Sequence, residues 1–140
     1  MQRINPVLAF GFCTAIIVLG VTALKTFEKN PLSYPNEPFP VEGPVKVGEV
    51  FRFKIERCAE YEVNYRWTEY YENSFTKEQY VQPGSSATAQ EGCQDVKSVP
   101  KQVPIDLKPG NYRLFFNLEI DGKFKKHKAI LRTEPFDVIE

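Results

Sequence analysis

Residues 111–120 read NYRLFFNLEI, and this stretch decides the fold. Its apolar side chains recur at every second position, which is the period of a strand with one buried face. They are Tyr112, Leu114, Phe116, Leu118 and Ile120. The next two residues, Asp121-Gly122, favour a hairpin, because both central positions of a type I′ turn need positive φ. The stretch therefore predicts a long core strand followed by a hairpin.

The strand that returns from this hairpin runs from Lys123 to about Thr133, and its inward face has two interpretations. A two-residue loop places the following side chains opposite the apolar face of the partner strand: Lys125, His127, Ala129 and Leu131. A three-residue loop places another set there: Phe124, Lys126, Lys128 and Ile130. Lysines on such a strand also protect a sheet against edge-to-edge pairing.

Two earlier runs alternate in the same way. In residues 50–56 (VFRFKIE), Phe51, Phe53 and Ile55 point to one face. In residues 61–68 (YEVNYRWT), every second residue from Tyr61 to Trp67 is apolar or aromatic, so we expect Trp67 to fill the core.

The remaining segments carry weaker signals. Val45 and Val47 predict a short first strand, and Phe75 to Val81 a weak one. Residues 82–92 (QPGSSATAQEG) are small and polar, which predicts an exposed, mobile loop. Residues 96–107 contain Pro100 and Pro104, so a strand there lies at a sheet edge or is interrupted.

Residues 107–112 (LKPGNY) carry the most specific local motif. A leucine, then Pro-Gly, then a tyrosine that opens a strong strand resembles the tyrosine corner of immunoglobulin-like and fibronectin-type-III-like sandwiches. The resemblance covers residues 45–140 and implies an all-β, single immunoglobulin-like antiparallel β-sandwich. It also implies that the Tyr112 hydroxyl bonds to the backbone a few residues upstream. Leu114 stands where antibody domains have their second cysteine, so the chain departs from that subclass.

Residues 7–24 (VLAFGFCTAIIVLGVTAL) contain no charge, and as a helix they would rise ~27 Å, close to the thickness of a hydrocarbon core. We favour a transmembrane signal anchor with residues 1–6 in the cytoplasm and the domain periplasmic or extracellular. The competing interpretation is a signal peptide cleaved after Ala23. Gly11 and Ala15 have the small-xxx-small spacing of a weak helix dimer. The whole pattern is similar to small single-pass envelope proteins of bacteria and phages.

Residues 25–44 link this segment to the domain. Five prolines fall within residues 30–44 (NPLSYPNEPFPVEGP), and proline prevents both helix and regular strand pairing. The composition predicts an extended stalk that reaches ~45 Å in polyproline II geometry.

Cys58 and Cys93 are the two cysteines of the exported part. An oxidising compartment predicts a disulfide between them, which would close a long loop. A CxxC redox motif is absent from the sequence, and His127 is its only histidine. The sequence therefore predicts neither a metal site nor a cofactor.

Charge and motifs exclude several function classes. The 18 basic and 18 acidic side chains balance, and this gives no basic footprint for a nucleic acid. Neither a nucleophile motif nor a glycine-rich phosphate loop stands out, so we expect no enzyme.

We expect instead a binding or assembly module for a protein or a glycan at the cell envelope. The alternative is a structural accessory subunit of a larger membrane complex. The candidate binding residues are exposed aromatics, the small polar loop and the basic hairpin: Tyr70, Tyr71, Ser85, Ser86, Phe115, Lys125, Lys126 and Lys128.

Overall fold

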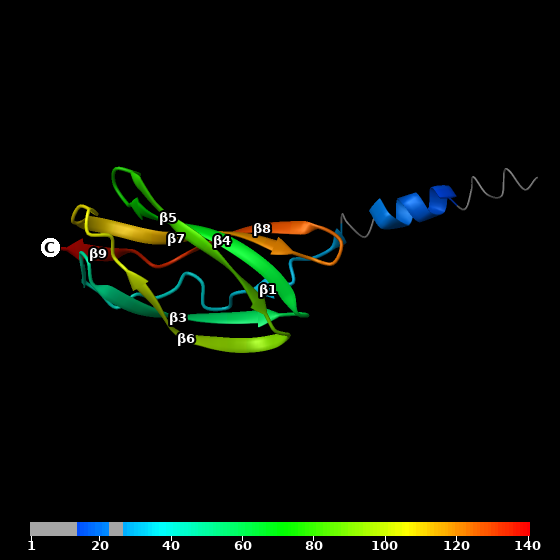
Figure 1. The fold of residues 1–140 in the computed structure, drawn as a ribbon, viewed down its shortest axis with the longest axis horizontal. Coiled ribbons are helices and arrows are strands. Elements are labelled where there is room, and N and C mark those ends of the chain that lie inside the picture. Colours follow the sequence, from blue (N-terminus) through cyan, green and yellow to red (C-terminus); the bar gives the residue numbers. More distant parts are fainter. Residues whose placement is uncertain (1–13, 23–26) are drawn as a thin grey trace, which may run out of the picture.

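The long strand predicted from residues 111–120 is β7 (Gly110–Asp121), and its alternating apolar side chains are buried. The computed structural model describes residues 14–22 and 27–140, the side chains of residues 95–98 excepted. In this part of the chain, strands form two sheets that face each other (Figure 1). The prediction of an all-β sandwich is confirmed.

The larger sheet is built around β7. Strand β4 (Val63–Asn73) pairs with one side of β7, and β5 (Gln79–Ala89) pairs with β4. The other side of β7 pairs first with β9 (Phe136–Ile139) and then with β8 (Lys126–Arg132). The short strand β2 (Val45–Lys46) runs parallel to β9.

The smaller sheet has the order β1-β3-β6 within the described residues. These strands are β1 (Leu32–Ser33), β3 (Val50–Ala59) and β6 (Gly92–Gln102). Pro100 lies opposite Arg52 in this pairing, and β6 forms the sheet edge, as its prolines predict.

The core between the sheets is rich in aromatic rings. Phe39 contacts Phe53 and Phe116, and Phe51 contacts Phe136, with ring centroids 5.3–6.4 Å apart. All five side chains are buried. Each such burial stabilises the fold by roughly 1.5–3 kcal/mol.

The tyrosine corner implied by residues 107–112 is present. The Tyr112 hydroxyl donates to the carbonyl oxygen of Lys108 at 2.7 Å, four residues upstream. Tyr112 itself is buried. The bond fixes the loop that leads into β7.

The hairpin between β7 and β8 differs from both predicted turns. Asp121 pairs with Lys126, so the loop comprises the four residues 122–125. His127, Ala129 and Leu131 lie opposite the buried face of β7, which is the face that the two-residue alternative predicted.

The proline-rich segment is not an extended stalk. Leu32 pairs with Ala59 of β3, and Phe39 is fully buried and bridges to Thr133. The segment packs along the sandwich because large apolar side chains stand between its prolines, and their removal from water stabilises the packed arrangement. It therefore completes the core instead of holding the domain at a distance.

Residues 75–92 also differ from the prediction. Phe75 lies in an exposed turn, and the strand begins only at Gln79. It continues to Ala89 through residues predicted as a mobile loop. Gly84 explains how such residues join the sheet, because a Cβ there would clash with the carbonyl oxygen of Trp67. The register shift between Trp67 and Glu69 needs this close approach.

Half of the predicted anchor falls on residues whose structure is not described. Residues 14–22 are helical, and Thr22 donates to the carbonyl of Val18 at 2.9 Å. Across the described residues, no helix is both long and apolar enough to cross a membrane. Residues 7–13, Ala23 and Leu24 lie outside the described part, as does Gly11 of the predicted helix dimer.

The predicted disulfide is confirmed. Cys58 and Cys93 are directly opposite each other on β3 and β6, and their sulfurs are bonded. Cys58 is half-buried and Cys93 is exposed. The bond joins neighbouring strands of the smaller sheet, next to the tight connection from β5 to β6.

Candidate ligand-binding cleft between the sheets

The structure gathers some of the predicted binding residues on the outer face of the larger sheet. Tyr70 and Phe115 are paired across β4 and β7, and their rings stack with centroids 5.1 Å apart and planes 3° apart. Ser86 lies opposite Arg66 on the same sheet, and Lys128 is exposed there. The stack leaves both rings half-buried.

Three predicted binding residues lie elsewhere. Tyr71 is buried in the core, 1% exposed, because β4 alternates and Tyr71 points inward while Tyr70 points outward. Its hydroxyl donates to the carbonyl of Gln102. Lys125 lies in the hairpin loop, and Ser85 is opposite Trp67 beside the register shift.

A hollow of about 420 Å³ lies on the outer face, and two of its three charged side chains, Arg66 and Glu119, already pair with each other. Arg66 donates to both carboxylate oxygens of Glu119, at 2.6 and 3.1 Å. Lys126 lies 3.3 Å from the same carboxylate. These bonds lower the pKa of Glu119 to about 2. A ligand would have to compete with them, so this hollow is the less favourable site.

A second cavity, of about 210 Å³, lies between the two sheets. Its lining combines aromatic and aliphatic side chains with two cations: Tyr34, Ile55, Arg57, Tyr65, Trp67, Val99, Lys101, Phe116, Leu118 and Leu131. Tyr65, Trp67 and Arg57 are half-buried, so the cavity reaches the surface as a cleft. A concave, mostly apolar site with few polar groups is the usual form of a ligand site.

One wall of the cleft is aromatic. Tyr65 and Trp67 alternate inward on β4, and their rings stack with centroids 5.6 Å apart. Trp67 therefore lines the cleft and does not fill the core as predicted. Tyr34 lies at the same cleft, and its burial, with Tyr65 nearby, raises its pKa well above the usual range although Arg57 opposes the shift. The Tyr34 hydroxyl thus stays protonated and can donate.

Arg57 supplies the cleft with a positive charge. It donates to the Tyr65 hydroxyl at 2.7 Å and to the side-chain oxygen of Gln94 at 3.2 Å. Among the side chains that the structure describes, no carboxylate lies within ion-pair distance of Arg57. A half-buried guanidinium with neutral partners such as these can bind an anionic group bidentately.

The other cation of the cleft is neutralised within the protein. Lys101 donates to Glu69 at 2.7 Å, and both side chains are largely buried. The Lys101 ammonium also lies 5.6 Å from the Phe116 ring centroid. Of the two cations that line the cleft, Arg57 is therefore the one that remains for a ligand.

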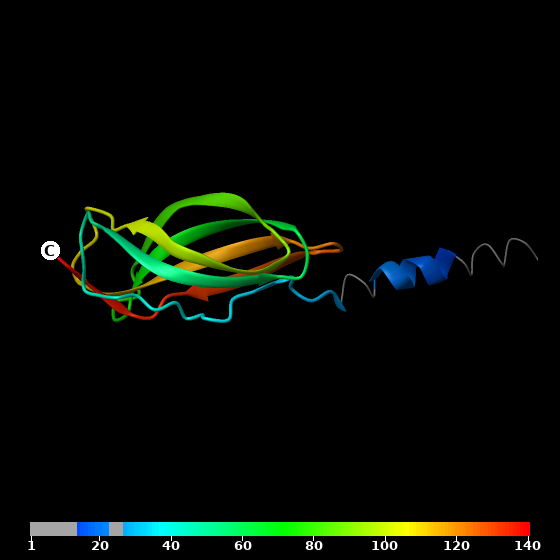
Figure 2. The ribbon, with the colours of Figure 1, turned by 90° about the horizontal axis from the view of Figure 1, so that it is seen from below.

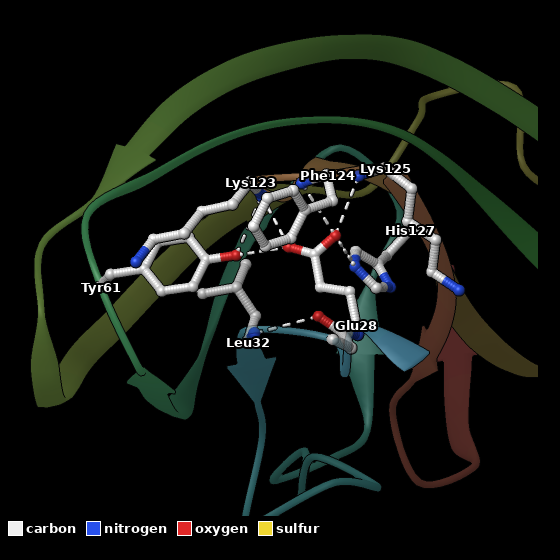
Figure 3. A network of polar contacts seen from close by, with 8 residues as sticks. Glu28, Leu32, Tyr61, Lys123, Phe124, Lys125 and His127 are labelled. Atoms are coloured by element: carbon white, nitrogen blue, oxygen red, sulfur yellow. Dashed lines mark hydrogen bonds and ion pairs between the residues drawn. The ribbon is translucent and has the colours of Figure 1, made fainter. Parts of the chain in front are cut away.

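A separate polar cluster lies at the end of the sandwich where the N-terminal segment joins it (Figure 3). One carboxylate oxygen of Glu28 accepts from the Tyr61 hydroxyl at 2.9 Å and from the backbone N–H of Lys123 at 2.6 Å. The other accepts from the backbone N–H groups of Phe124 and Lys125, at 3.1 and 2.9 Å. Burial alone would raise the pKa of Glu28, but these bonds lower it to about 2.

His127 is the buried neighbour of this carboxylate. Its Nε2 lies 3.3 Å from a Glu28 oxygen, without the geometry of a hydrogen bond. A carboxylate next to a histidine can orient a general base, but within the described part of the chain no hydroxyl or thiol forms a hydrogen bond with His127 Nε2. Three or more potential metal ligands do not cluster anywhere in the described part.

Sequence reasoning missed Tyr34, Arg57 and Lys101. Arg57 could have been found, because it continues the inward phase of Phe53 and Ile55 along β3. Tyr34 could not, because its segment reads as a proline-rich spacer.

Comparison with known proteins supports the fold. No protein-family model and no curated protein matches the chain. Among solved structures, the C-terminal domain of Wzt is similar, with a TM-score of 0.52 and 12% identity, over 81% of this chain and 77% of that chain. A family 123 glycoside hydrolase from Clostridium perfringens, described for glycolipid glycan hydrolysis, has a TM-score of 0.38 and 12% identity, over 67% of this chain and 21% of that one. At these identities the first likeness shows a shared β-sandwich and the second carries no argument.

Proposed function

We propose that this chain is a non-enzymatic binding module whose cleft between the sheets takes an apolar side chain of a partner protein. The observation that carries the proposal is Arg57, a cation without a carboxylate partner among the described side chains, beside the stacked rings of Tyr65 and Trp67. A pocket that buries one large side chain, with a charge at its rim, is typical of the centre of a protein interface.

The cleft favours an anchor of defined chemistry. Its volume of about 210 Å³ suits one aromatic or large aliphatic side chain, and its floor is apolar. Arg57 favours an acidic residue next to that anchor. A partner segment that combines both features would fill the cavity and neutralise the guanidinium.

The envelope is the proposed location, with an immunoglobulin-like sandwich outside the cytoplasm. The Cys58–Cys93 disulfide supports an oxidising compartment. The uncharged sequence of residues 7–24 supports a single-pass anchor with a cytoplasmic N-terminus. The partner is then another envelope or membrane protein.

Selection of random displayed peptides on the full chain tests the proposal. The expected consensus is a large apolar residue beside Asp or Glu. Trp67→Ala and Arg57→Gln should each weaken a selected peptide at least about tenfold. The matched controls are Phe75→Ala and Arg132→Gln, which change exposed residues outside the cleft. Peptides that bind all four variants equally would refute the proposal.

Two other outcomes identify the competing functions. A sugar ring can also stack on aromatic faces, so selective binding on a glycan array that requires Trp67 would show a glycan ligand. Recovery of one large complex at fixed stoichiometry in mild detergent would instead show a structural accessory subunit. Either result, without peptide binding, overturns the proposed peptide anchor.

A further inference from the structure

We propose that the β7–β8 hairpin tip, residues 122–126, docks on an anionic lipid surface. This inference deepens the membrane placement proposed above, because the anchor would bring the tip to the bilayer. It assigns a second membrane contact to the folded domain itself.

The first argument is position. The hairpin and the start of the sandwich near residue 28 lie at the same end of the domain, opposite the C-terminus (Figures 1 and 2). Glu28 accepts three backbone N–H groups of the loop, so residue 28, near the start of the sandwich, is fixed to the tip. A membrane reached by the N-terminal segment therefore lies on the side of the hairpin.

The second argument is the exposed apolar surface at this end. Phe27 is 80% exposed and Phe124 is 44% exposed. Aromatic side chains next to lysines are typical of protein surfaces that lie at the headgroup level of a bilayer. Two exposed phenylalanines flank the position at which Glu28 joins the loop to the N-terminal segment.

The third argument is charge. Lys123, Lys125 and Lys126 carry three positive charges within four residues of the tip, and Lys126 lies 3.3 Å from the Glu119 carboxylate at its edge. The Glu28 carboxylate offsets one of the other two lysines but is only 9% exposed, because it lies beneath the loop. The whole chain has zero net charge, so the positive charge of the tip is local. Three exposed or half-buried lysines on a hairpin suit a partner with diffuse negative charge, such as an anionic lipid surface, better than a partner with one shaped pocket.

The magnitude follows from the charges. Each lysine near an anionic leaflet favours binding by about 1 kcal/mol, so removal of three lowers the docked-to-free ratio by on the order of a hundredfold. Lys123 also lies 4.5 Å from the Tyr61 ring centroid, a contact that a glutamine loses. High salt should weaken docking of the unmodified tip in the same direction.

The experiment measures the depth of residue 124 in the full chain. The Phe124→Trp variant is mixed with vesicles of brominated phosphatidylcholine, with and without phosphatidylglycerol. The parent chain, whose only tryptophan is Trp67, gives the background. We expect quenching of the introduced tryptophan that requires phosphatidylglycerol and is lost in high salt.

A charge-matched pair of variants supplies the control. Replacement of Lys123, Lys125 and Lys126 by glutamine in the Phe124→Trp chain should abolish the quenching. Replacement of three lysines at the opposite end should leave it unchanged: Lys46, Lys77 and Lys108. Quenching that equals the parent background, or that both triple variants lose equally, would overturn the inference.

Alkaline extraction of the same vesicles separates this inference from the anchor. A chain that resists extraction is inserted through its N-terminal segment, whatever residue 124 does. A chain that is extracted but shows quenching dependent on phosphatidylglycerol retains the docking tip without the anchor. The two proposals therefore fail independently.

Discussion

Loss of the Cys58–Cys93 disulfide should lower the stability of the sandwich without changing its fold. The double substitution Cys58→Ser and Cys93→Ser removes a cross-link between residues 35 positions apart. One cysteine is half-buried and the other exposed, so the substitution leaves no core cavity. The two strands also remain joined by their backbone pairing. The expected loss is therefore that of the cross-link alone.

Its magnitude follows from loop closure in the unfolded chain. A closed loop of about 35 residues gives roughly 3.8 kcal/mol at 25 °C in the chain-entropy model. With an unfolding entropy of about 2.1 cal/mol/K per residue over roughly 110 residues, this lowers the Tm by about 16 °C.

Chemical and thermal unfolding of the full chain in mild detergent, followed by circular dichroism, measures the loss. The parent chain under reducing conditions is the control and should unfold like the double variant. A loss below about 1 kcal/mol would refute the reasoning, because it would mean that the unfolded chain already keeps these segments together. A change in the folded spectrum would show instead that the bond organises the smaller sheet.

Three further predictions concern buried polar contacts. Tyr112→Phe removes the 2.7 Å bond to the Lys108 carbonyl and should cost about 1 kcal/mol in urea unfolding, whereas an unchanged midpoint would show that the corner is not stabilising. Glu69→Gln leaves the largely buried Lys101 without its anion and should lower the free energy of unfolding by on the order of 2 kcal/mol. The double variant Glu69→Gln, Lys101→Met should recover most of that loss, because it no longer buries an unpaired charge. The pKa of Glu28 is lowered from 4.5 to about 2 in the folded chain, so as the pH falls the Glu28 carboxylate is protonated in the unfolded chain before it is protonated in the folded one. The free energy of unfolding should therefore be at its full value above about pH 5 and decline towards pH 2. The decline should be less steep in the Glu28→Gln variant than in the parent chain. An identical pH profile for that variant would show that other carboxylates dominate the acid response.

Alternation predicts much of the sandwich because strands have a strict two-residue period. It identified β3, β4 and β7, and the Pro-Gly-Asn-Tyr sequence identified the corner at Tyr112. Local pattern failed where pairing with a neighbour decides the conformation. Strand β5 has a run of small polar side chains without alternation, and it forms a strand because β4 offers it backbone partners on both sides of the register shift.

The candidate site was less accessible to sequence reasoning. A cleft between two sheets depends on how far apart the sheets lie, which no single strand encodes. Trp67 has the correct phase for the core, yet it lies in the cleft beside Tyr65. The hydrogen bonds of Glu28 also cannot be predicted from a local sequence pattern, because they join residue 28 to backbone groups nearly one hundred positions later.

The packing of the proline-rich segment along the sandwich limits how far the domain can lie from a membrane anchor. If the anchor ends at Leu24, the four peptide steps to Glu28 allow at most ~14 Å between the membrane surface and the domain. A free stalk would have let the module sample partners well away from its own bilayer. With the proposed anchor, the packed segment would restrict the module to partners in the same membrane or pressed against it, and such confinement would raise their effective concentration. A low-affinity cleft would then be sufficient for stable association.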